Sequence, residues 1–397
     1  MGIASAGRGA GSSTTSVLIG LYYYHPYLSG LSEYARRLAE GLVRSGCRVT
    51  VVCTRHEADL PEETWIEGVK VIRAPILLRH GKGVLSPAFW RRVVRLAKDH
   101  DVVNLHLPLP DSGLVAPFLD ADRLLLTYHC DVNLGDALLD RVIEAISYRL
   151  MSVAMKRAAA IVGNSDSYFR NCRFREYGTK YRTIHPPVDT ALFRGGRDGR
   201  PPGDDGKRPP GDRGEPYTIG FVGRIVYEKG LQYLFEAIPR LRRSIGNVRV
   251  LVVGDSTGVA GGSVMDELRP YRDAHPETIR FLGRLSVDEL VRFYHDIDVL
   301  VLPSIDPLES FGMVQVEAMC CGTPVVASDL PGVDEVVGAT GFGRLARPRD
   351  PDDLAHQIEL VKEGRFERAD FDPSRWDTAA TVDEYVRLID ELNRQPA

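Results

Sequence analysis

The stretch Glu309-Ser-Phe-Gly-Met-Val-Gln-Val-Glu317 carries most of the information about fold and chemistry in this sequence. An apolar strand pattern, Val299–Leu302, precedes it, and a second, Val325–Ala327, follows it. On a single helix the two glutamates would lie about 80° apart around the axis, so they would not share a face. The pattern therefore predicts that Glu309 lies in the loop that enters a helix and that Glu317 lies two turns into that helix.

The residues between the two carboxylates predict an anion site. Ser310, Phe311 and Gly312 would offer backbone N–H groups at the helix N-terminus, where a phosphate binds readily. Glu317 lies among apolar residues, and a carboxylate buried without a partner is costly, so we expect hydroxyls, an amide or a cation beside it. From spacing alone, another interpretation stays open, in which Glu309 caps the helix and Glu317 pairs with a structural arginine.

Length, charge and cysteine content narrow the class of protein. A chain of 397 residues with 44% hydrophobic content predicts two or three domains with substantial cores. A net charge of -4 argues against general nucleic-acid binding. The six cysteines show neither metal-ligand spacing nor a disulfide pattern, which favours reduced thiols in the cytoplasm. No run approaches about 20 apolar residues, so no membrane span is expected.

The order of apolar and helical segments predicts two similar halves. Short apolar runs alternate with helical patterns through residues 16–194 and again through 217–371, as in parallel sheets covered on both faces. Residues 195–216 lack core-forming side chains and are expected to be a disordered linker. Residues 1–15 are rich in Gly, Ser and Ala and are expected to be a mobile tail; they lack the apolar region of a secretory signal. Ligands of doubly wound sheets bind beyond the carboxyl ends of the strands, in the cleft.

Two further places carry polar residues at predicted strand ends. Gly223-Arg224 follows a strand and Lys229-Gly230 opens the next helix, so two cations at one turn could hold a diphosphate. A solvated surface pair is the alternative. His129 follows the apolar run Leu124–Tyr128; a lone histidine is usually structural, but at a strand end it is a candidate ligand contact.

These motifs resemble a known family. The phrases ESFGMVQVEAM, CGTPVVASDLPG and FVGRIVYEKG resemble the signature of the family 4 glycosyltransferases, strongly from about Tyr217 to Val337 and loosely across the first half. The resemblance implies an α/β chain with the GT-B fold, in which two Rossmann-like, doubly wound parallel-sheet domains face each other across a cleft. It also implies that the final segment, 372–397, crosses back onto the first domain.

The resemblance also implies roles for particular residues. Arg224 and Lys229 would hold the diphosphate of a donor, Glu309 and His129 would position its sugar, and Glu317 would hold its ribose. In the family two glycines often precede the first helix, whereas this chain has Ser29-Gly30. Further donor contacts would come from the following residues: Gly30, Gly223, Arg284, Leu285, Ser310, Phe311, Gly312 and Met313.

The function that the resemblance implies is a retaining glycosyl transfer. A hexose would move from a UDP- or GDP-linked sugar to a hydroxyl of a glycan, a lipid-linked acceptor or a small molecule. No metal cofactor is expected, since cations and a helix dipole would do its work. The alternatives are another GT-B enzyme, such as a sugar-nucleotide epimerase, and a non-catalytic sugar-nucleotide-binding subunit. A dehydrogenase or a P-loop ATPase is disfavoured because their glycine-rich motifs are absent.

One helix pattern has two interpretations. Arg91, Arg92, Arg95 and Lys98 share a predicted helix with several apolar residues. A basic amphipathic helix can lie on an anionic membrane, which would put the protein at the inner face of the membrane. Alternatively, the apolar stripe packs on the sheet, as in an ordinary surface helix.

Overall fold

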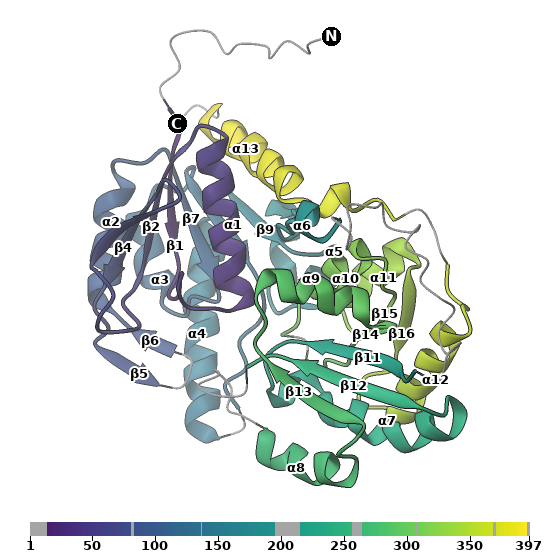
Figure 1. Cartoon of the computed structure of the whole chain (residues 1–397). Coiled ribbons are helices and arrows are strands. Elements are labelled where there is room, and N and C mark those ends of the chain that lie inside the picture. Colours follow the sequence, from purple (N-terminus) through teal and green to yellow (C-terminus); the bar gives the residue numbers. More distant parts are fainter. Residues whose placement is uncertain are drawn as a thin grey trace, which may run out of the picture.

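The structure is a computed structural model, and it describes residues 14–80, 83–135, 137–194, 215–255, 264–306, 308–367 and 371–394. It contains two large β-sheets with helices packed against their faces (Figure 1). Nearly all of the expected tail, 1–15, and linker, 195–216, lies outside the described residues.

The first sheet has eight strands in the order β10-β9-β8-β7-β1-β2-β4-β3, and only the edge strand β3 runs antiparallel to its neighbour. The sequence did not predict β3, which is short and half exposed. A separate two-stranded hairpin, β5–β6, follows β4 in the chain. The bounds of these strands are β1 (Ser16–Gly20), β2 (Arg48–Thr54), β3 (Glu63–Ile66), β4 (Val69–Ala74), β5 (Leu78–His80), β6 (Gly83–Leu85), β7 (Val102–Leu107), β8 (Leu124–Tyr128), β9 (Ala160–Gly163) and β10 (Tyr181–Thr183).

The second sheet has six strands, all parallel, in the order β13-β12-β11-β14-β15-β16. The strand order reverses beside β11, which makes a topological switch point between β11 and β14. The bounds of its strands are β11 (Tyr217–Val222), β12 (Val248–Val253), β13 (Ile279–Gly283), β14 (Val299–Leu302), β15 (Val325–Ser328) and β16 (Gly343–Ala346).

The helices follow the predicted alternation closely. The patterns at 31–44 and 138–158 correspond to α1 and α4, and the capping box Ser286/Glu289 starts α9 as expected. The bounds are α1 (Gly30–Arg44), α2 (Pro87–Ala97), α3 (Ser112–Val115), α4 (Leu138–Arg157), α5 (Asp166–Asn171), α6 (Thr190–Arg194), α7 (Leu231–Ser244), α8 (Met265–Ala274), α9 (Val287–Asp296), α10 (Met313–Cys320), α11 (Asp334–Thr340), α12 (Pro351–Lys362) and α13 (Thr378–Arg394).

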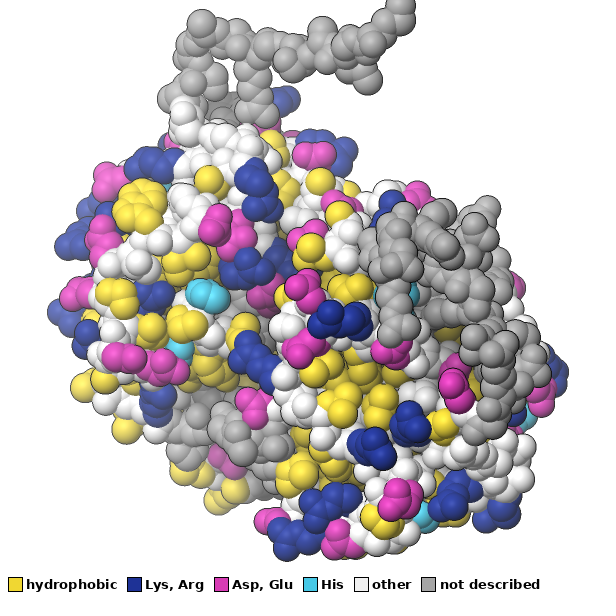
Figure 2. Space-filling view, in the orientation of Figure 1, with side chains coloured by type: hydrophobic (Ala, Val, Ile, Leu, Met, Phe, Trp, Pro, Cys, Tyr) yellow, Lys and Arg dark blue, Asp and Glu magenta, His cyan; other side chains and the backbone are white. Residues whose placement is uncertain are grey.

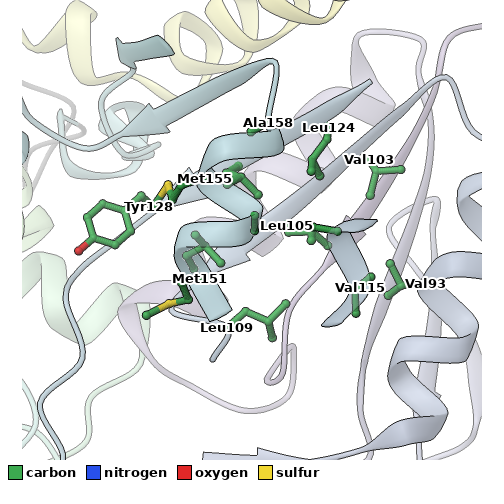
Figure 3. Close-up of a cluster of buried hydrophobic side chains, with 14 of the residues drawn as sticks. Val93, Val103, Leu105, Leu109, Val115, Leu124, Tyr128, Met151, Met155 and Ala158 are labelled. Carbon is green, nitrogen blue, oxygen red and sulfur yellow. The ribbon is translucent and has the colours of Figure 1, made fainter. Parts of the chain in front are cut away.

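The first sheet is covered on both faces by helices that are far apart in sequence. On one face, α2, α3 and α4 close a cluster that includes Val93, Leu105 and Met151 (Figure 3). On the other face, α1 lies beside the C-terminal helix α13 (Figure 1). The hydroxyl of Tyr385 on α13 lies 2.9 Å from both the Tyr34 hydroxyl and the Thr127 hydroxyl. The last helix of the chain is therefore part of the core around the first sheet.

Helix α2 packs its apolar stripe onto the first sheet. Phe89 and Val93 are completely buried, and the Trp90 indole N–H donates to the Asp111 carboxylate. Arg91 and Arg95 remain exposed on the outer side. The structure thus agrees with the packing interpretation of this segment. Within the described ranges, no helix is long and apolar enough to cross a membrane.

The surface charge is mixed. On the face shown in Figure 2, Lys and Arg side chains are interspersed with Asp and Glu side chains over both halves of the molecule. This distribution accords with the small net charge of -4.

Helices α1 and α13 approach so closely that Gly41 has no room for a side chain. A Cβ atom there would lie 2.3 Å from Cγ2 of Val382, a β-branched residue with little rotamer freedom. We expect Gly41→Ala to lower the melting temperature, because overpacking typically costs about 1–3 kcal/mol.

Gly338→Ala on α11 is the matched control. Among the described residues nothing lies within 4 Å of a Cβ placed there, so the helix preference for alanine, about 1 kcal/mol, should hold or raise the melting temperature. Equal melting temperatures for the two variants would show that α13 does not pack tightly on α1.

Candidate active site

A cavity of about 900 Å³ lies where the carboxyl ends of the two sheets face each other. Residues that follow β1, β7, β8 and β9 line it from the first sheet, and residues that follow β11 and β14 line it from the second. Nine of the predicted site residues lie in this lining: Gly30, His129, Arg224, Lys229, Glu309, Ser310, Phe311, Gly312 and Met313.

An ion pair stands at the centre of the second sheet's contribution. The Lys229 ammonium contacts the Glu309 carboxylate, and the side chains are 17% and 18% exposed. Gly230, which follows Lys229, has φ +68°, and a Cβ atom there would lie 1.9 Å from the Pro303 carbonyl oxygen. Only glycine fits this turn, where the backbone of Gly230 packs against the Pro303 carbonyl.

Arg224 adds a second cation to the same edge. Its guanidinium lies 3.4 Å from the Glu228 carboxylate, and both residues line the cavity. Two cations and two carboxylates therefore share one wall, where an incoming anion could exchange partners with the carboxylates.

The turn before α10 differs from the prediction. Gly312 has φ +77°, and a Cβ atom there would lie 2.6 Å from Leu302. A left-handed residue cannot belong to a right-handed helix, so α10 begins at Met313 and Glu317 lies about one turn into it, not two. The amides without an intrahelical partner are therefore centred on the first turn after Gly312, later than the Ser310–Gly312 segment that the sequence indicated.

A buried amide holds this turn in place. The Gln315 side-chain Nε2 donates to the carbonyl of Phe311 at 2.8 Å and to that of Val333 at 3.0 Å. Sequence reasoning missed Gln315, because its partners only become apparent once the loop is folded back on the helix.

The starts of two helices meet across the cavity. A Cβ atom on Gly30, the first residue of α1, would lie 3.9 Å from Cε of Met313, the first residue of α10. Ser29 caps α1: its hydroxyl accepts from the Ser32 amide at 3.1 Å, and the Ser32 hydroxyl accepts from the Ser29 amide at 2.8 Å. The serine that replaces a usual glycine therefore has a structural use as a helix cap.

His129 is one of a buried histidine pair. Its Nε2 lies 3.0 Å from Nδ1 of His106, so one ring donates to the other. Burial lowers the pKa of His129 to about 3 and places the pKa of His106 well below its usual range, so both rings are neutral at pH 7. Sequence reasoning missed His106; its position at the carboxyl end of β7, the strand beside β8, was the available signal.

Glu317 has the partners that a buried carboxylate needs, and it does not line the cavity. Tyr294 donates its hydroxyl to Glu317 at 2.9 Å, and the Arg37 guanidinium on α1 lies 3.8 Å away. Burial raises the pKa of Glu317, while Arg37 and the Tyr294 hydrogen bond oppose that rise. This contact joins the two halves of the molecule.

The remaining predicted donor contacts also fall outside the cavity lining. Gly223 has its amide bonded to the Val253 carbonyl at 3.0 Å, directly beside Arg224. Arg284 is exposed beyond β13, and Leu285 packs against the apolar cluster around α9 and α10. Arg284 and Leu285 follow β13, which is the edge strand of its sheet.

Comparisons with known proteins match both halves of the chain. Residues 204–374 match the family described as glycosyl transferases group 1, and residues 28–192 match the family described as glycosyltransferase family 4. The chain belongs to the group 1, family 4 glycosyltransferases. Among the described residues of this glycosyltransferase, no group of three or more His, Cys, Asp or Glu side chains could hold a metal ion.

Curated relatives cover the glycosyltransferase to different extents. An uncharacterised glycosyltransferase of Methanocaldococcus jannaschii is 27% identical over 84% of this chain and 85% of its own length. A glycogen synthase of Mycobacterium tuberculosis is 34% identical over 46% of this chain and 45% of its own length. A D-inositol 3-phosphate glycosyltransferase of Corynebacterium jeikeium is 31% identical over 54% of each. The chain thus matches about half the length of the last two.

Solved structures share the fold. A sucrose-phosphate synthase from Thermosynechococcus elongatus has a TM-score of 0.66 and 19% identity, covering 96% of this chain and 97% of its own. Anabaena HepE, solved in complex with UDP and glucose, has a TM-score of 0.66 and 19% identity, covering 95% and 100%. The glycosyltransferase therefore has the GT-B fold predicted from its sequence.

The Arg37–Glu317 contact predicts a pH-dependent loss of stability. Replacing Arg37 with methionine leaves a carboxylate buried without its cation, and breaking such a pair typically costs about 3–5 kcal/mol. Loss of Arg37 also raises the pKa of Glu317 further. Glu317 is protonated in the folded state below its raised pKa, so the destabilisation should be small at acidic pH and should grow as the pH rises through that pKa.

Melting temperatures measured from pH 4 to pH 8 test this expectation. In the double variant Arg37→Met/Glu317→Gln the Glu317 charge is removed, so the slope should shrink to the part that comes from Glu33, which Arg37 also contacts at 2.9 Å. An Arg37→Met penalty that is the same at every pH would mean that Glu317 does not depend on Arg37.

Proposed function

We propose that this glycosyltransferase moves a hexose from a UDP- or GDP-linked sugar to an acceptor hydroxyl and retains the anomeric configuration. The observation that carries the proposal is the cavity, where Lys229, Glu309 and His129 meet the start of α10. The Anabaena protein with the same fold holds UDP and glucose, which supports a sugar nucleotide as donor.

Lys229, Arg224 and the start of α10 would bind the diphosphate. Charge-assisted hydrogen bonds to phosphate are strong, and the positive end of a helix dipole favours the same charge. Both cations contact carboxylates in the structure, so binding would exchange Glu309 and Glu228 for phosphate oxygens. These groups would also stabilise the charge that develops as the diphosphate leaves, and we propose that no metal ion is needed.

Glu309 and His129 would then position the hexose. Released from Lys229, the Glu309 carboxylate can accept hydrogen bonds from sugar hydroxyls. The neutral His129 ring, held by His106, offers its remaining nitrogen to another hydroxyl. Glu317 is proposed to hold the ribose, which requires its carboxylate to turn from Arg37 towards the nucleotide.

Retention follows from attack on the face that the diphosphate leaves. The acceptor oxygen bonds to the anomeric carbon as the bond to the diphosphate breaks, and a departing phosphate oxygen takes the acceptor's proton. This route needs no enzymic nucleophile. The epimerase and the non-catalytic subunit are not favoured, since the chain belongs to a transferase family. The names of the relatives point to different acceptors, since one is a glycogen synthase and another is a D-inositol 3-phosphate glycosyltransferase.

Glutamine substitutions separate the roles of the two glutamates. We expect Glu309→Gln to lower turnover at saturating donor on the order of a hundredfold, because it removes a preorganised contact to the reacting sugar. We expect Glu317→Gln mainly to lower the affinity for the donor and for the free nucleoside diphosphate by the same factor, because the ribose contact is made equally in the ground state and the transition state. Calorimetric titration with nucleoside diphosphate and separate turnover assays measure the two effects.

Glu277→Gln, an exposed glutamate before β13, is the control and should change neither quantity. NMR of the product should show the donor's anomeric configuration in every active variant. Full turnover by Glu309→Gln, or an inverted product, would refute the assigned mechanism.

Chelation tests the proposal that no metal is required. Transfer assayed after treatment with EDTA should proceed at the untreated rate, because protein cations neutralise the diphosphate. A loss of activity that Mg²⁺ or Mn²⁺ restores would contradict this part of the proposal.

A further inference from the structure

A second part of the cavity is lined only by the first sheet's half and has no role in the mechanism above. Its residues come from the loops after β1 and β2 and from the β5–β6 hairpin: Tyr23, Tyr27, His56, Glu57 and Arg79. The predictions from sequence did not include any of these residues.

Tyr23 and Tyr27 form an aromatic surface. Their rings stack with centroids 4.5 Å apart and an angle of 29° between the planes. The loop that carries them is held at Tyr27, whose amide donates to the Tyr24 carbonyl at 3.1 Å and whose carbonyl accepts from the Ser32 hydroxyl at 2.7 Å. Since Ser32 also belongs to the cap of α1, the aromatic surface is fixed to a helix start on the cavity wall.

His56 stands edge-on to both tyrosines. Its ring centroid is 5.4 Å from that of Tyr27 and 6.2 Å from that of Tyr23, with planes at 80° and 65°. The side chain is 5% exposed, and neither ring nitrogen has a hydrogen-bond partner among the described residues. Buried polar atoms are nearly always paired, so these two nitrogens are the groups that a ligand would satisfy.

The charged neighbours of His56 narrow the chemistry of that ligand. Glu57 lies 3.9 Å from the His56 ring and is 60% exposed, and Arg79 donates to the His56 carbonyl. Burial lowers the pKa of His56, so the ring is neutral at pH 7 and has one donor and one acceptor. Hydroxyls both donate and accept hydrogen bonds, so they can pair with the Glu57 carboxylate, with the Arg79 guanidinium and with the neutral His56 ring alike.

We propose that Tyr23, Tyr27 and His56 form an acceptor subsite that binds the ring of a saccharide. This inference rests on the proposed function and names the class of its acceptor. A pyranose has an apolar face of C–H groups, which the negative face of an aromatic ring attracts, and a rim of hydroxyls. The tyrosine rings can pack against the apolar face of the pyranose. The side chains of His56, Glu57 and Arg79 can form hydrogen bonds with its hydroxyls.

Saturation-transfer NMR on the full chain tests the subsite. The probes are methyl α-D-glucopyranoside, methyl α-D-mannopyranoside and maltose, with inositol 3-phosphate as a phosphorylated polyol that is not a saccharide. We expect at least one saccharide to bind, with saturation strongest on the C–H protons of one ring face. The phosphorylated polyol should bind more weakly than that saccharide.

Substitutions then assign the binding to these side chains. We expect saccharide affinity to fall by about tenfold in the double variant Tyr23→Leu/Tyr27→Leu and again by about tenfold in the separate variant His56→Ala. Tyr23→Phe/Tyr27→Phe should keep most of the affinity, because the ring faces remain. Tyr271→Leu, which alters a tyrosine on α8 outside the cavity lining, is the matched control and should leave saccharide binding unchanged.

Calorimetric titration of the same variants with UDP and GDP separates this inference from the proposed function. Nucleotide affinity should match that of the parent in every variant. If the parent binds neither nucleotide, the proposed function fails. If nucleotide binds but no saccharide does, or the leucine variants keep saccharide affinity, the acceptor subsite alone is refuted. Nucleotide affinity lost in the leucine variants would make the tyrosines a base platform and would also refute it.

Discussion

The arrangement of this molecule depends on one geometric constraint: parallel strands end at the same edge of their sheet. Two such edges face each other here, so short loops that are far apart in sequence supply a single cavity. His129 follows β8, Arg224 follows β11 and Glu309 follows β14. Each loop needs only to place one or two side chains, since β8, β11 and β14, which are almost entirely buried, fix where each loop begins.

Polar contacts between the halves make the two edges depend on each other. Arg37 of α1 approaches Glu317, the Asn164 side chain donates to the Ser310 hydroxyl at 2.8 Å, and Ser167 donates to Asp334 at 2.8 Å. The chain itself also connects the halves a second time, because α13, which follows the second half in sequence, packs into the core of the first half. A ligand that takes Glu317 away from Arg37 would therefore alter the contact between the halves as well as its own site.

The sequence predicted whatever depends on periodicity and on residues adjacent in the chain. The two parallel sheets, the turn that carries Arg224 and Lys229, and the position of His129 at a strand end all follow from local patterns. The late start of α10 could not be predicted, because the local pattern does not show that Gly312 adopts a left-handed conformation, in which a Cβ atom would lie 2.6 Å from Leu302. The approach of Arg37 to Glu317, of His106 to His129 and of His56 to the two tyrosines depends on folding that brings distant segments together.

The central claim is that Lys229 binds the diphosphate of a sugar nucleotide. Titration of the parent and of Lys229→Met with a nucleoside diphosphate and with the matching monophosphate tests it most directly, using whichever of the uridine and guanosine series the parent binds. We expect the substitution to weaken diphosphate affinity by roughly tenfold or more, as for a lost charge-assisted hydrogen bond, and to leave monophosphate affinity nearly unchanged. Equal affinity of both proteins for the diphosphate would contradict it.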